Sequence, residues 1–332
     1  MTQPSLNHVF CPDAAGGHRM AYWQWGQPDS AHVVLCVHGL TRQGRDFDVL
    51  AQALCAQAAL SPHFPHGLRV VCPDVAGRGE SDWLKDPEGY QVPAYAADML
   101  VLLAHLQAQA PITTLDWVGT SMGGLIGMVV CGQPALSAAR PPPGALSSSP
   151  GHEAASFSLP VPVRKLVLND VGPALQAQAI ARIGAYLGQA GHFNTLQEAA
   201  DVLWLISRSF GPHTPEQWLT LSRPMVRPVS PGADSPLRLH YDPAIAQPFK
   251  SATQESAQQA EALLWQLYDR ITAQTLLLRG ALSDLLSHET AQAMTQRGPH
   301  AQLIEFEGIG HAPTLITPDQ IAAVTGFLLD NR

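Results

Sequence analysis

Short apolar runs alternate with longer amphipathic stretches along the first 131 residues. The runs predicted to be strands are 33–37, 68–72 and 113–118. The stretches with the apolar spacing of helices are 46–59, 93–106 and 122–131. Strands that alternate with helices of about 10–15 residues form a mostly parallel sheet. The sequence therefore predicts an α/β fold, with a mostly parallel central sheet and helices on both faces.

Two segments interrupt this alternation. Residues 134–162 contain seven prolines, which are incompatible with a regular helix or a central strand, so we expect a mobile surface insertion. Residues 174–270 carry helical spacing and no strand signal, and the strand–helix alternation returns after them. We therefore predict a core formed by residues 1–173 and 271–332. Residues 174–270 would form a helical cap over the carboxyl ends of the strands, where open α/β sheets bind ligands.

Composition narrows the partners of the chain. It has 332 residues, 19 Lys+Arg and 27 Asp+Glu, and a net charge of −8, without a basic cluster. Such a chain is a poor ligand for nucleic acids or anionic membranes. No basic and apolar leader and no long apolar span are visible. Cys36 and Cys72 lie in apolar runs, and none of the five cysteines forms a CxxC pair, so we expect free thiols and a cytoplasmic protein.

The sharpest motif is Gly119-Thr120-Ser121-Met122-Gly123, which fits G-x-S-x-G between a predicted strand and a predicted helix. A serine at the tip of such a tight turn needs neighbours without bulk, and the following helix aims its N-terminus at the reacting carbonyl. Ser121 is therefore the candidate nucleophile.

On this motif and several others, the chain resembles the α/β-hydrolase superfamily. The resemblance includes His38-Gly39 after one strand, the segment from Asp74 to Ser81 after the next, and a late histidine. It implies that His311, in the loop 308–313, is the general base. For the acid that orients it we favour Asp284, in the loop after the strand 275–278. Asp170, at the end of the strand 163–168, is the alternative.

The resemblance also implies an oxyanion hole formed by the backbone N–H groups of Met122 and Leu40. Arg42 and Gln43 could reach the pocket mouth, although we favour solvated loop positions for both. The cap region is rich in aromatic residues, some of which we expect to line the substrate pocket. The three candidates are Trp218, Tyr241 and Trp265.

The predicted function is serine-dependent hydrolysis of a small or medium carboxylic ester or lactone through an acyl-enzyme. No cofactor is implied, and no metal-binding spacing or phosphate loop occurs in the sequence. Ser121 argues against dehalogenase and epoxide hydrolase chemistry, because those reactions need a carboxylate as the nucleophile at this position. Two alternatives stay open: a slow-turnover small-molecule receptor of the same fold, and hydrolysis of a C–C bond in a vinylogous keto acid. The latter would use cationic groups, for which the candidates are Arg182, Arg208, Arg223, Arg227 and Arg238. The oligomeric state cannot be read from the sequence.

Overall fold

The structure is a computed structural model, and it describes residues 3–133, 159–189, 191–232, 235–251 and 253–330. Most of the predicted insertion, 134–158, lies outside the described residues. No helix within the described ranges is both long and apolar enough to cross a membrane.

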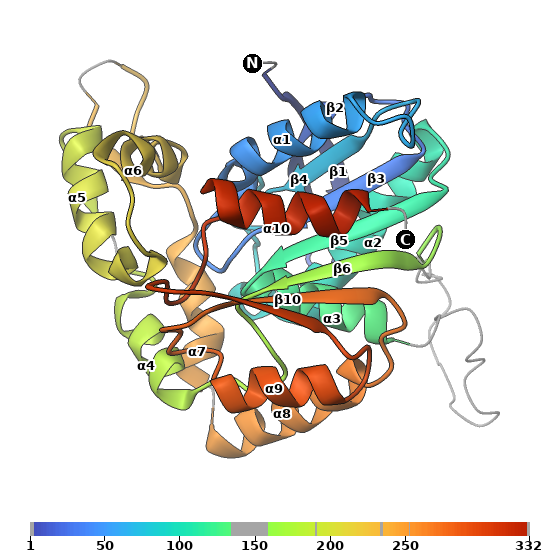
Figure 1. The fold of residues 1–332 in the computed structure, drawn as a ribbon. Coiled ribbons are helices and arrows are strands. Elements are labelled where there is room, and N and C mark those ends of the chain that lie inside the picture. The colour runs from blue at the N-terminus through green and yellow to red at the C-terminus, as the bar shows by residue number, and fades with distance from the viewer. Residues whose placement is uncertain (1–2, 134–158, 190, 233–234, 252, 331–332) are drawn as a thin grey trace, which may run out of the picture.

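An eight-stranded sheet forms the centre of the molecule, in the order β1-β2-β4-β3-β5-β6-β10-β11 (Figure 1). The strands are β1 (Ser5–Cys11), β2 (His18–Gly26), β3 (His32–Val37), β4 (Arg69–Pro73), β5 (Thr114–Thr120), β6 (Val163–Asn169), β10 (Gln274–Gly280) and β11 (Gln302–Phe306). The six strands β4, β3, β5, β6, β10 and β11 pair in parallel. At one edge, β1 and β2 form an antiparallel hairpin, and β2 pairs antiparallel with β4. The predicted α/β fold with a mostly parallel sheet is confirmed.

Helices cover both faces of this sheet (Figure 1). On one face lie α1 (Asp48–Ala59) and α10 (Pro318–Leu329), which share a hydrophobic core with the strands. The other face carries α2 (Val92–Gln109), α3 (Met122–Gly132), α8 (Gln254–Tyr268) and α9 (His288–Gln296). The inner strands β3, β4, β5, β6 and β10 are buried on both faces, which explains why they appear in the sequence as continuous apolar runs.

We call the described residues between the end of β6 and the start of α8 the cap. Its helices are α4 (Ala177–Tyr186), α5 (Leu196–Ser207), α6 (Pro215–Ser222) and α7 (Gln247–Ser251). The cap also contains short 3₁₀ helices at Arg208–Phe210, Arg223–Met225 and Pro243–Ala246. Two more, Gly44–Phe47 and Pro87–Gly89, lie in the core. The expectation that this region lacks strands is wrong, because β7 (His192–Phe193), β8 (Val226–Pro228) and β9 (Leu237–Leu239) form a small antiparallel sheet. Strands of two or three residues are too short to show an alternating pattern.

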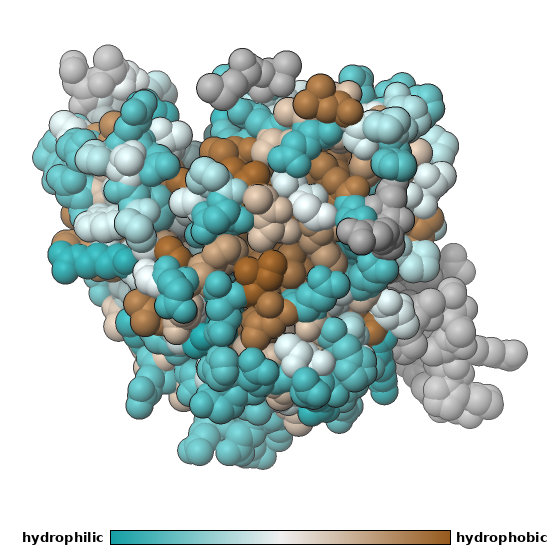
Figure 2. Space-filling view, in the orientation of Figure 1, coloured by the Kyte–Doolittle hydropathy of each residue, from teal (hydrophilic) through white to brown (hydrophobic). Residues whose placement is uncertain are grey.

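The last helix of the predicted cap belongs to the helical layer over the central sheet. Helix α8 packs against α3, so closely that a Cβ at Gly132 would stand 2.2 Å from the Leu267 carbonyl oxygen. Figure 2 shows hydrophilic side chains over α5 and α6 and over the lower helices, and hydrophobic ones gathered nearer the middle of this face.

Candidate active site

The turn between β5 and α3 raises Ser121 at the carboxyl edge of the sheet. Ser121 has φ 50° and ψ −114°, a conformation that an L-residue adopts only when its surroundings enforce it. Its backbone N–H donates to the Asn169 carbonyl at 2.9 Å. A Cβ on Gly123 would stand 1.9 Å from the Val37 oxygen, so the motif's second glycine is required by the contact between α3 and β3.

His311 bonds to Ser121 through one ring nitrogen and to an aspartate through the other. The Nε2 atom lies 2.9 Å from Ser121 Oγ, and Nδ1 lies 2.7 Å from Asp170 Oδ2. In this arrangement Nδ1–H donates to the carboxylate and leaves Nε2 to accept the hydroxyl proton. The structure thus brings together Ser121 and His311, the two residues that the sequence analysis paired as nucleophile and base.

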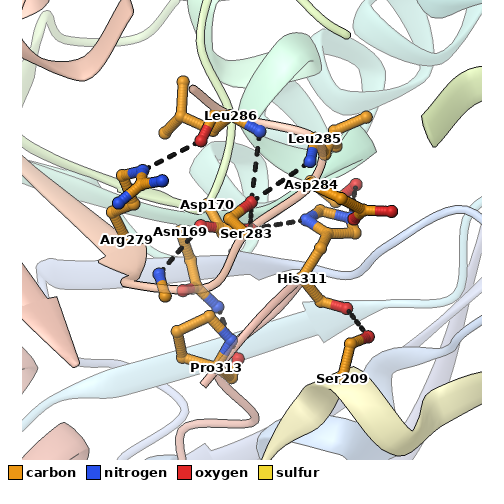
Figure 3. A network of polar contacts seen from close by, with 12 residues as sticks. Asn169, Asp170, Ser209, Arg279, Ser283, Asp284, Leu285, Leu286, His311 and Pro313 are labelled. Carbon is orange, nitrogen blue, oxygen red and sulfur yellow. Dashed lines mark hydrogen bonds and ion pairs between the residues drawn. The ribbon is translucent and has the colours of Figure 1, made fainter. Parts of the chain in front are cut away.

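The prediction that Asp284 orients His311 is wrong, and Asp170 occupies that place. Asp170 follows directly on the end of β6, which is the neighbour of β5 in the sheet. Its carboxylate is fully buried and also accepts the Gly280 N–H at 2.9 Å and the Ser283 hydroxyl at 2.7 Å (Figure 3). Four residues beyond β10, Asp284 is 45% exposed and forms a bidentate ion pair with Arg182 of α4. The loop after β10 therefore supplies Ser283, which holds Asp170, instead of the acid itself.

The two predicted oxyanion donors border the same cavity as Ser121. Met122 is the first residue of α3, so its N–H has no acceptor within the helix. Leu40 lies in the loop after β3, and in the described part of the chain its N–H donates to no protein acceptor. Both residues border the cavity next to Ser121.

His38 fixes the direction of the Leu40 N–H. Because its Nε2 accepts the Val75 N–H at 2.9 Å, its Nδ1–H donates to the Gly39 carbonyl at 2.7 Å. That carbonyl and the Leu40 N–H belong to one planar peptide group and point in opposite directions. Complete burial lowers the pKa of His38 to about 3, so the ring is neutral, as this bonding requires.

Arg78 is a second buried support of the same loop, and the sequence analysis placed it in the segment from Asp74 to Ser81 without assigning it this role. The side chain is 1% exposed, and its guanidinium donates to the Leu40 carbonyl at 2.8 Å and to the Tyr95 hydroxyl at 2.9 Å. It also lies 3.7 Å from the Met122 sulfur. Among the described residues no carboxylate forms an ion pair with it. A buried cation thus contacts both residues expected to hold the oxyanion.

Two cavities meet at Ser121, and both are bordered by Leu40 and Ile183. The larger, of about 520 Å³, has mostly apolar walls, which include Leu125, Val171, Leu175, Ile180, Phe249 and Leu285. The smaller, of about 80 Å³, is bordered by His311, by apolar side chains such as Ile206 and Phe210, and by several polar groups. These groups are Thr41, Arg42, Arg182, Tyr186 and Ser207.

The prediction that Trp218, Tyr241 and Trp265 line the pocket is wrong, because none borders either cavity. Trp218 is the centre of the cap's own core, where its Nε1–H donates to the Ala200 carbonyl and its ring contacts Trp204. Tyr241 is buried and pairs with the backbone of Arg78. Trp265 packs on Tyr268 and under the Arg297 guanidinium. The helical spacing of Trp218 identified a buried aromatic residue without showing which surface it contacts.

Arg42 and Gln43 also differ from expectation, since both are buried and not solvated. Arg42 pairs with Asp46 at 2.6 Å and donates to the Leu221 carbonyl, and the Gln43 amide donates to the Pro224 carbonyl. The loop after β3 is therefore bonded to the cap.

Comparison with known proteins identifies the class. The model of the alpha/beta hydrolase family matches residues 34–324, and the chain belongs to this family. It is 45% identical to a 3-hydroxybutyrate-oligomer hydrolase of Cupriavidus necator over 324 residues, 98% of this chain and 97% of that protein. An alpha/beta hydrolase of Novosphingobium aromaticivorans has 34% identity and a TM-score of 0.74, with 99% of each chain covered. A Rickettsia typhi protein of the same fold has 26% identity and a TM-score of 0.76, over 99% of this chain and 100% of the other. The chain is thus a hydrolase of the alpha/beta fold.

Proposed function

We propose that this hydrolase cleaves soluble oligoesters of a short 3-hydroxy acid through an acyl-enzyme on Ser121. The observation that carries the proposal is the chain of hydrogen bonds from Ser121 Oγ through His311 to Asp170, with distances of 2.9 and 2.7 Å. The likeness to the 3-hydroxybutyrate-oligomer hydrolase supports the choice of ester.

In the proposed reaction, Ser121 Oγ attacks the ester carbonyl while its proton passes to His311 Nε2. The N–H groups of Leu40 and Met122 stabilise the oxyanion. Asp170 stabilises the imidazolium that His311 becomes when it takes this proton. His311 then passes the proton to the departing alcohol oxygen. Water, activated by the same ring, attacks the acyl-enzyme and releases the acid and free Ser121.

The position of His311 orients the substrate. The leaving oxygen receives its proton from His311, so the alcohol side belongs in the smaller cavity, which His311 borders. The acyl side then occupies the larger apolar cavity, which begins at Met122 and extends along Leu125. An oligoester would cross Ser121 with one hydroxy-acid unit on the His311 side and the rest of the chain opposite.

The site gives little support to the C–C hydrolase alternative. Of the five arginines considered for a substrate carboxylate, only Arg182 borders either cavity. Its guanidinium is already held by Asp284 in a bidentate pair, which neutralises its charge.

The test combines labelling with turnover. A fluorophosphonate should label the wild type with one equivalent and leave Ser121→Ala unlabelled. Linear dimers and trimers of 3-hydroxybutyrate should be hydrolysed over many turnovers, and Ser121→Ala should lower kcat by about a thousandfold or more. Labelling that persists in the variant would refute the assignment of the nucleophile. One equivalent of product without further turnover would indicate a receptor instead of an enzyme.

A further inference from the structure

A second group of chemically active side chains lies outside the active site, at the edge of the sheet formed by the β1–β2 hairpin (Figure 1). Cys11 ends β1 and His18 begins β2, and the two are directly paired across the hairpin. Asp98 reaches them from α2. One ligand atom from each lies within 4.8 Å of the others, and all three residues are buried.

The arrangement has the dimensions of a transition-metal site. His18 Nε2 and Asp98 Oδ2 are 3.2 Å apart. Two ligands of a tetrahedral zinc ion, each at about 2.1 Å from the metal, stand roughly 3.4 Å apart. Thiolate, imidazole and carboxylate are the three side-chain ligands that zinc takes in proteins.

The surroundings of His18 supply the feature that distinguishes a metal site from a simple cluster. Its other ring nitrogen, Nδ1, bonds to Asp13 Oδ2 at 3.0 Å. Asp13 is itself fixed, because Oδ1 accepts the N–H groups of Ala15 and Gly17 at 2.7 and 2.8 Å. A carboxylate on the far nitrogen is how proteins orient a metal-binding histidine and set its tautomer. The loop 12–16, which joins Cys11 to His18 and contains Asp13, is exposed.

We propose that Cys11, His18 and Asp98 bind one divalent transition-metal ion of the zinc type. The ion would join the β1–β2 hairpin to α2. The site would be structural, since β4 and β3 stand between β2 and β5, the strand that precedes Ser121.

The three proposed ligands come from two elements, because Cys11 and His18 lie on the hairpin and Asp98 lies on α2. The sequence concealed the site because Asp98 is 80 residues from His18.

The experiment uses the full chain, stripped with a chelator and titrated with Co²⁺ as the probe. We expect one equivalent to bind with a thiolate-to-cobalt charge-transfer band, and the band to be lost in Cys11→Ser. Cys55→Ser is the matched control, because Cys55 lies on α1 and should leave the band unchanged. Asp13→Asn should weaken binding by about 10–100-fold, as expected for loss of a supporting carboxylate.

A second readout covers variants that fold poorly. Stoichiometric Zn²⁺ should raise the melting temperature of the wild type and of Cys55→Ser, but not that of Asp98→Asn. A band that survives in Cys11→Ser would overturn the proposal. So would a wild type that shows neither a band nor a rise in melting temperature, and the cluster would then be a hydrogen-bonded network only. Ester hydrolysis is not involved in either readout, so failure here leaves the proposed function intact.

Discussion

At the scale of single residues, two carboxylates near the end of the sheet differ in what they contact. Asp170 is buried and bonds to His311, whereas Asp284 is half-exposed and pairs with Arg182. Asp170→Asn should therefore lower kcat by roughly 10³–10⁴-fold, because the amide cannot fix the tautomer that His311 needs. Asp284→Asn is the matched control and should change kcat only a few-fold. Steady-state kinetics on both variants checks the ranking, and the reverse order would return the acid to Asp284.

Arg78 is expected to act through the oxyanion loop. Arg78→Met removes the donor to the Leu40 carbonyl, so kcat should fall about 10–100-fold while KM changes little, since the loop matters most when charge develops on the substrate. Arg78→Lys keeps the charge and should recover part of the loss. The rate of labelling by a fluorophosphonate, which is tetrahedral, should fall by the same factor as kcat/KM.

Arg45→Met provides the control for this effect. Like Arg78, Arg45 lies over an aromatic ring, 4.7 Å from the centre of the Trp23 ring, but it pairs with Asp48 and contacts neither Leu40 nor Met122. Its kinetics should match those of the wild type. An increase in KM with unchanged kcat in Arg78→Met would contradict a role in positioning the oxyanion donors.

The sequence revealed Ser121 and His311 because each lies in a local motif that the backbone requires. Asp170 has no such motif, and only its place at the end of the strand beside β5 distinguishes it. Strand order is a property of long-range pairing, so the sequence could name Asp170 as an alternative without deciding for it. Arg78 bonds to the Leu40 carbonyl and His38 accepts the Val75 N–H, and no spacing in the sequence indicates these contacts between distant residues.

At the scale of elements, the contact between α3 and β3 depends on Gly123. A Cβ there would stand 1.9 Å from the Val37 oxygen, and backbone cannot yield as a flexible side chain can. Gly123→Ala should therefore destabilise the protein by several kcal/mol and abolish activity. Gly184→Ala, within α4 and with no atom within 4 Å of the added Cβ, should be neutral or stabilise by up to about 1 kcal/mol. Urea unfolding of both variants tests this difference.

The length of the larger cavity should set the acyl preference. Leu125 of α3 lines that cavity, so Leu125→Trp should shift the optimum in a series of p-nitrophenyl esters toward shorter acyl chains. Leu205→Trp is the control, because Leu205 of α5 is 60% exposed. If the optimum stays in place in Leu125→Trp, the acyl chain does not occupy this cavity.

The inner strands of the core could be predicted because they are buried on both faces, and α1 and α2 because each has one buried apolar side. The β1–β2 hairpin at the edge was not predicted, since β1 is largely exposed and shows no continuous apolar run. The cap was harder to predict, since its short strands and its aromatic residues follow contacts within the cap. Trp218 is an example. Its position on one side of its helix predicted burial, but its ring contacts Trp204 and its Nε1–H donates to Ala200 within the cap, away from the substrate cavity.

At the scale of the whole molecule, hydrogen bonds between the cap and the core hold the active site in place. Ser209 of the cap donates to the His311 carbonyl at 2.9 Å, and Arg42 of the core donates to the Leu221 carbonyl. The base and the oxyanion loop are therefore each tied to the cap, so that loosening the cap would disturb both.

The pH dependence of stability should carry the mark of the neutral, buried His38. Its pKa is about 3 in the folded protein and about 6.5 when unfolded, because burial disfavours the charged ring. Between these values only the unfolded chain binds the proton, so the free energy of unfolding falls as the pH falls below 6.5. The slope is about 1.4 kcal/mol per pH unit, and it amounts to about 5 kcal/mol by pH 3.

His38→Gln isolates this contribution, since a glutamine amide can also donate and accept but does not titrate. Urea unfolding at pH 4, 5, 6 and 7.5 should show that the stability of the wild type, relative to that of the variant, decreases toward low pH. His63→Gln, at an exposed position, should follow the wild type at every pH. Parallel curves for wild type and His38→Gln would mean that His38 takes up its proton in the folded protein. In that case the Nε2 atom could not accept the Val75 N–H, and another group would have to hold the Leu40 peptide in place.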